Sequence, residues 1–149
     1  MSSQFRQITA AIVAMLSAGP AVSSYIEADV DEDEPIPSAQ ADAVRVVLRG
    51  SVPQQFGGIH GNPVDWTTRV DVFVYAAVAG GTACDAADAL VLEVFARLSA
   101  TPGLGMPAEA GVYVDPPQID WAQERADRRE ARARMSLTIG HRTSAGSLA

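Results

Sequence analysis

Apolar residues near the N-terminus recur every three or four positions, which is the spacing of a helix with one buried side. A hydroxyl at Ser2 or Ser3 can cap this helix, and Gly19 and Pro20 end it. Its apolar stripe consists of Phe5, Ile8, Ile12, Met15 and Leu16. A second helix is predicted to begin after Thr82, and its buried stripe consists of Ala83, Ala87, Leu90, Val91, Val94 and Leu98.

Elsewhere the apolar residues alternate with polar ones, which is the period of a strand with one buried face. The strongest alternating run covers 66–78, and two further runs cover 43–49 and 131–142. Shorter candidate strands lie at 21–26, 112–114 and 119–123. The glycine- and proline-rich interval 50–65 is predicted to be a long loop. Residues 124–134 also read as a charged helix, so the start of the last strand stays open.

This order of elements predicts one α+β domain over residues 1–149, with an antiparallel or mixed sheet of four to five strands. Both helices are expected to pack on one face of the sheet, against the valines and leucines. The opposite face is expected to carry Arg45, Arg49, Arg69, Asp71, Phe73, Tyr75, Arg132 and Arg134. Arginine and aromatic side chains are enriched where proteins bind one another.

We therefore predict a subunit or partner interface made by a set of arginine and aromatic residues. The set is Arg45, Arg49, Arg69, Phe73, Tyr75, Arg128, Arg129, Arg132 and Arg134. The arginine cluster at 128–134 is equally compatible with an exposed edge paired with Glu124, Asp127 and Glu130. Trp66 and Trp121 are interpreted as core anchors at strand ends, with an interface role as the alternative.

Charge narrows the possible partners. The net charge is −7 and all 11 basic residues are arginine, which argues against a general nucleic-acid binder. Five carboxylates lie within six positions, and we expect a solvated loop there: Asp29, Asp31, Glu32, Asp33 and Glu34. A calcium loop would need glycine where Glu34 stands and glutamate where Gln40 stands, so that pattern fails. The apolar run 5–16 is interrupted by Gln7 and Thr9, so we expect a protein made in the cytoplasm, with no membrane partner.

Residues for catalysis do not form any known pattern in this sequence. With one cysteine, Cys84, and two histidines, His60 and His141, no zinc-ligand spacing is possible. The serine nucleophile elbow and the dinucleotide fingerprint are missing too. His60 stands in a glycine-rich stretch, where local hydrogen bonds are the simpler interpretation. We predict no enzymatic activity, no catalytic or cofactor-binding residues, no metal site and no cofactor.

Several segments together resemble a known family. The run 66–76 (WTTRVDVFVYA) is followed by the helix 83–94 (ACDAADALVLEV), a proline-rich connection, an acidic stretch at 120–127 and the closing run 135–142 (MSLTIGHR). With the N-terminal helix, this order is similar to the tail terminator and minor tail protein family of long-tailed bacteriophages. The resemblance spans nearly the whole chain and depends on order and pattern.

The resemblance implies a structural virion protein at the junction of tail and neck. Such proteins assemble as a ring, usually a hexamer, that ends the tail tube and meets the head-side connector while DNA passes through its lumen. We hypothesise that Asp29, Asp31, Glu32, Asp33 and Glu34 line or rim this lumen, because clustered carboxylates repel phosphate. Two other functions stay open from the sequence: another neck component, such as a head-completion or connector protein, and a small protein-binding adaptor.

Overall fold

The computed structural model describes residues 2–31, 33–54, 61–77, 82–123 and 130–149. In chain order, the helices and strands are α1 (Gln4–Ser17), β1 (Ile26–Ala28), β2 (Asp42–Pro53), β3 (Val64–Ala77), α2 (Ala83–Ala100), the short 3-10 turns η1 (Pro102–Gly105) and η2 (Ala108–Ala110), β4 (Tyr113–Val114), β5 (Gln118–Gln123) and β6 (Glu130–Thr143).

The strands form one mixed sheet of six strands. Their order is β1, β2, β3, β6, and both β4 and β5 lie along the far side of β6. Strand β1 runs parallel to β2, and all other pairs are antiparallel. This confirms the predicted α+β fold with a mixed sheet and two helices. The sheet has six strands because two very short ones, β1 and β4, add to its edges.

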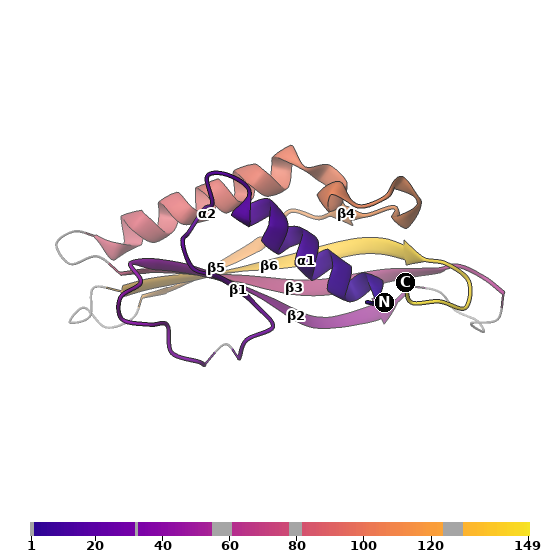
Figure 1. Ribbon diagram of the computed structural model, residues 1–149, viewed down its shortest axis with the longest axis horizontal. Helices are drawn as coiled ribbons and strands as arrows, with labels where there is room; N and C mark the ends of the chain where they lie inside the picture. Colours follow the sequence, from indigo (N-terminus) through magenta and orange to yellow (C-terminus); the bar gives the residue numbers. More distant parts are fainter. Residues whose placement is uncertain (1, 32, 55–60, 78–81, 124–129) are drawn as a thin grey trace.

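Both helices cover the same face of the sheet (Figure 1). Helix α1 packs on β1 and β2, and α2 packs on β3 and β6. The core between the two layers contains fully buried side chains from α1, β2, β3 and β6: Ile8, Ile12, Leu16, Val44, Val46, Val70, Val72, Met135, Leu137 and Ile139. At the start of α2, Ala83 and Ala87 pack on Ala76 and Ala131. These small side chains let the helix approach the sheet closely.

Three predicted boundaries are wrong. The interval 50–65 is not all loop, because β2 continues to Pro53 and β3 begins at Val64. The register shift between Leu48 and Gly50 is a bulge that lets the two strands keep pairing past Arg49. The first short strand begins at Ile26, where the predicted one ended. Ser3 precedes α1, but its side chain makes no cap bond; its carbonyl oxygen accepts from the Gln7 amide at 3.1 Å.

Candidate interaction surface

The sheet face opposite the helices is the outer face, and it carries the predicted arginine and aromatic residues. Pairing between strands places Arg45, Phe73, Arg134 and Asp120 in one row across β2, β3, β6 and β5. Two guanidinium groups lie beside aromatic rings, each with its carbon 5.4 Å from a ring centroid: Arg49 over Phe73, and Arg132 over Tyr75. Such stacking holds the arginine side chains against the sheet.

Burial divides the outer face into two parts. Arg45 is 5% exposed and Asp71 is 1% exposed, so both side chains belong to the interior of the chain. Arg45 Nε donates to Glu27 Oε2 at 2.7 Å, and Arg49 Nε donates to Asp71 Oδ2 at 2.8 Å. A buried charge requires such a partner to offset its lost hydration. The exposed arginines of this face are Arg49, Arg69, Arg132 and Arg134.

Ion pairs set the protonation of two carboxylates on this face. Burial of Glu27 opposes its ionisation, but hydrogen bonds from Tyr25 and Arg45 outweigh burial and lower the pKa of Glu27. Arg134 donates to Asp120 at 2.9 Å, which lowers the pKa of Asp120 and raises the pKa of Arg134. Both carboxylates are therefore charged at neutral pH, and the outer face presents paired charges of both signs.

We call residues 29–34 the acidic segment. They belong to the connection from β1 to β2, which lies on the side of the sheet away from the helices, as the outer face does (Figure 1). Arg45 donates to the carbonyl oxygen of Glu34, and this bond ties the segment to the sheet. Asp29, Asp31, Asp33 and Glu34 are all exposed. The segment thus covers part of the outer face and exposes Asp31, Asp33 and Glu34 to solvent, while the exposed Asp29 pairs with Arg6 of α1.

The two sites predicted separately from the sequence therefore adjoin each other. A cavity of about 350 Å³ lies between the segment and the sheet, and its lining includes Asp33, Phe73, Asp120, Arg132 and Arg134. Sequence could not show this, because it depends on the path of the connection between β1 and β2. Three predicted site residues, Glu32, Arg128 and Arg129, lie outside the described residues, as does His60.

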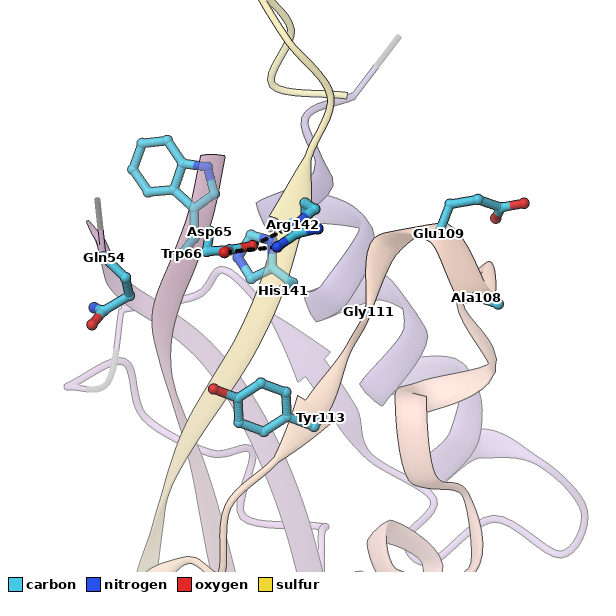
Figure 2. A pocket seen from close by; sticks show the side chains of 9 residues that line it. All are labelled: Gln54, Asp65, Trp66, Ala108, Glu109, Gly111, Tyr113, His141 and Arg142. Atoms are coloured by element: carbon cyan, nitrogen blue, oxygen red, sulfur yellow. Dashed lines mark hydrogen bonds and ion pairs between the residues drawn. The ribbon is translucent and has the colours of Figure 1, made fainter. Parts of the chain in front are cut away.

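A second hollow, of about 600 Å³, lies where β3 begins and β6 ends (Figure 2). Arg142 donates to both oxygens of Asp65, with distances of 2.6 and 2.9 Å, and this pairing lowers the pKa of Asp65. The ring of Tyr113 lies over Gly140: a Cβ atom at Gly140 would sit 2.1 Å from that ring. A side chain at Gly140 would therefore displace the exposed Tyr113 ring from this position.

His141 lines the same hollow, but its ring is turned into the interior. Its Nδ1 lies 2.6 Å from Gln4 Oε1, and its Nε2 lies 2.7 Å from Thr68 Oγ1. Burial lowers the pKa of His141, so the ring is neutral near pH 7. Both nitrogens are used by these bonds, and His141 is a structural residue. Sequence reasoning missed this hollow because its residues meet only through the register of β3 and β6.

Across the described ranges, no three His, Cys, Asp or Glu side chains gather as ligands of a metal ion would. Within the same ranges, no helix has the length and apolar character that a membrane span requires. The surface offers charge, hydrogen bonds and aromatic contact area, which are the means of binding another macromolecule.

Solved structures share this fold, whereas the sequence comparisons find no match. No protein-family model and no curated protein matches the sequence. Among solved structures, the chain is similar to one described as the virion of a native gene transfer agent particle, with a TM-score of 0.57 and 14% identity, covering 95% of this chain and 100% of that one. It is also similar to the sheath/tube terminator of an extracellular contractile injection system in the extended state, with a TM-score of 0.51 and 15% identity. That match covers 99% of this chain and 60% of the terminator chain.

Proposed function

We propose that this protein is a structural subunit of a phage-type particle, which forms a ring at the end of the tail tube and joins the tube to the head-side connector. The observation that carries the proposal is the fold shared along nearly the whole chain with a gene transfer agent virion chain and with a sheath/tube terminator. The proposed site of action is the junction of tail and neck, after synthesis in the host cytoplasm. The protein has no catalytic role in this proposal.

The partners are other copies of this chain in a ring, a hexamer in our proposal, together with the tail tube protein and the connector. The outer face supports this role because it combines exposed arginines with aromatic rings. The exposed cations there are Arg49, Arg69, Arg132 and Arg134, and Phe73 and Tyr75 are the half-buried rings beside them. Arginine and tyrosine supply a large share of the binding energy at protein interfaces. Arg45 contributes by holding the acidic segment in place.

DNA passes through the lumen of the proposed ring without sequence-specific contact. We propose that the acidic segment faces this lumen, with Asp29, Asp31, Glu32, Asp33 and Glu34 repeated in every subunit. Its described carboxylates are exposed, and the chain that carries them runs along the side of the sheet away from the helices, although Asp29 itself pairs with Arg6 of α1; this path supports the orientation. A wall of carboxylates does not bind phosphate, so DNA can move along it.

A second candidate is another neck component, such as a head-completion or connector protein. The gene transfer agent chain, which the match covers over 100% of its length, is described only as part of a virion. Its description therefore does not distinguish a terminator from another neck component.

The test is electron microscopy of particles produced by a strain that lacks this gene, with the gene restored on a plasmid as the control. Overlong tails, or tails of irregular length, are the result expected of a missing terminator. Tails of normal length that do not join heads favour the neck component. Normal particles with joined heads and tails would overturn both proposals.

A further inference from the structure

Large apolar side chains gather at one flank of the molecule, where exposure in water is unfavourable. In the described residues, Ile119 and Trp121 of β5 are 36% and 51% exposed, and Leu92 and Phe95 of α2 are 62% and 43% exposed. We call these four residues the apolar flank. A rimmed apolar patch on a small protein commonly marks a binding surface.

The four residues lie on the same side of the sheet. Ile119 pairs with Met135 and Trp121 pairs with Ala133, and both partners belong to the core under the helices. Residues directly opposite each other in a sheet project to the same face, so Ile119 and Trp121 project to the helix side. They stand at the edge of the helical layer, next to the strand that α2 covers.

Helix geometry brings Phe95 to this edge. Arg97 points toward α1, since its guanidinium donates to the carbonyl oxygens of Met15 and Ala18. At about 100° per residue, Phe95 lies roughly 160° around the helix axis from Arg97. Phe95 therefore projects away from α1, in the direction of β5. Phe95 of the helix and Trp121 of the edge strand thus project toward the same flank of the molecule.

The backbone of this edge is also open. Strand β5 pairs with β6 on one side, and no strand in the described part of the chain pairs with its other side. At the opposite end of the sheet, β1 pairs only with β2 within the same ranges. An edge strand with apolar side chains is a template for pairing with another chain.

The two edges differ in charge in a complementary way. Strand β1 leads directly into the acidic segment, whose exposed residues include Asp31, Asp33 and Glu34. Strand β5 lies beside the exposed Arg132 and Arg134 of β6, of which Arg134 pairs with Asp120 of β5. A contact between the β5 edge of one copy and the β1 edge of the next would bring opposite charges together. Such a head-to-tail contact uses two different surfaces; its repetition closes a ring where the rotation between copies returns to the first copy, and builds a filament where it does not.

We propose that the apolar flank is the contact by which one copy of this chain binds the next, with Trp121 as its centre and the β1 edge of the neighbouring copy as its partner. This inference rests on the proposed ring and assigns the ring contact to the flank rather than to the arginine and aromatic residues of the outer face. The part of the outer face away from Arg132 and Arg134 is then available to the tube, the connector and the lumen.

The test is a concentration series in sedimentation velocity with three proteins. These are the unchanged chain, the double variant Ile119→Ser/Trp121→Ser, and the control variant Val52→Ser/Leu148→Ser. The control removes two apolar side chains that are 61% and 52% exposed but lie away from the flank. The unchanged chain and the control should self-associate equally, and the flank variant should associate at least about tenfold more weakly. All three should share one circular dichroism spectrum and one unfolding midpoint, because the altered side chains are exposed.

Fluorescence provides a readout that reports on Trp121 itself. In a Trp66→Phe background, Trp121 is the sole tryptophan, and its emission should shift to shorter wavelength as the concentration rises. A chain that stays monomeric throughout, an emission that does not shift, or association that persists in the flank variant would each overturn the inference.

Electron microscopy of the same samples separates this inference from the proposed function. Closed rings that survive the flank substitutions would support the ring and overturn the assignment of its contact. Filaments or dimers that the substitutions dissolve would support the contact and count against a closed ring.

Discussion

His141 shows how a single buried side chain connects distant parts of the sequence. Because Gln4 Oε1 can only accept, the proton on the neutral ring is on Nδ1, and Nε2 accepts from the Thr68 hydroxyl. Thr68 Oγ1 also lies 2.7 Å from Ser51 Oγ, so the chain of bonds joins α1, β6, β3 and β2. A second proton on the ring would remove the acceptor that Thr68 uses and place a charge in the interior.

This arrangement predicts a loss of stability in mild acid. The pKa of His141 is lowered from 6.5 in the folded chain, so the unfolded chain binds the additional proton first. The neutral His141 ring contributes its full share to the free energy of unfolding above pH 6.5, and this share is lost as the pH falls from there through the pKa of the folded chain. The unfolding midpoint should fall between pH 7.5 and 5.5, as measured by circular dichroism. The variant His141→Gln should be less stable at pH 7.5 and show a flatter profile; an equally steep one would contradict the prediction.

At the scale of elements, Arg97 joins the two helices. Its guanidinium donates to the carbonyl oxygens of Met15, Leu16 and Ala18, at 3.0, 3.2 and 2.7 Å, and also to that of Pro20. The last carbonyls of a helix have no partner within the helix and carry partial negative charge. One side chain of α2 therefore satisfies the C-terminal end of α1 and fixes the angle between the helices.

Removing this guanidinium should destabilise the protein. We expect Arg97→Ala to lower the free energy of unfolding by about 2 kcal/mol, because charge-assisted bonds to partly buried carbonyls are lost together. Urea denaturation measures this change. Arg97→Lys should recover only part of the loss, since one ammonium cannot reach all four oxygens. The control is Arg142→Ala, which removes the ion pair with Asp65. Because the Arg142 side chain is 54% exposed, this change should lower the free energy of unfolding by less than about 1 kcal/mol. Equal losses for Arg97→Ala and Arg142→Ala would contradict this account.

Regular elements with one buried face were predictable from their period. From Ala131 to Ile139, strand β6 alternates between core residues such as Met135 and more exposed residues such as Arg134, and its observed bounds extend the predicted run 131–142 by one residue at each end. The end of β2 was not predictable. Its period stops at Gly50, and the strand continues because β3 supplies pairing partners, for example Thr68 opposite Ser51. Such pairing is a property of the tertiary structure rather than of local sequence.

The sequence predicted which residues share the outer face, but not which of them are covered by other parts of the chain. The alternation in β3 and β6 correctly placed Phe73, Tyr75, Arg132 and Arg134 on one face. Whether a side chain on that face is buried depends on what covers it, and the sequence does not indicate that the acidic segment lies over Arg45. Trp121 illustrates the same limit: it was interpreted as a core anchor, with an interface role as the alternative, and it is 51% exposed.

For the whole molecule, the acidic segment determines much of the net charge. Replacing its five carboxylates with the matching amides would change the net charge from −7 to −2. The fold should tolerate this, because the described carboxylates are exposed and asparagine accepts the positive φ of 59° at Asp29. Particles that carry this variant should release DNA more slowly, because the lumen wall would no longer repel phosphate. DNA release triggered in vitro measures the rate.

A matched control alters carboxylates on another part of the surface. Asp88→Asn/Glu109→Gln removes two exposed negative charges, one on α2 and one in the connection that follows it. Release from these particles should remain at the normal rate. Equal rates in all three particle types would show that the segment does not face the DNA.

The parallel pairing of β1 with β2 has a consequence for how the acidic segment can change during evolution. A chain that leaves β1 at Ala28 must travel back along the sheet before Asp42 can begin β2, and residues 29–41 are this return path. A parallel connection needs about a dozen residues, so the path tolerates little shortening. Its side chains, in contrast, point mainly into solvent. Selection can therefore adjust the charge of this surface one residue at a time, while deletions that shorten it would detach the first strand from the sheet.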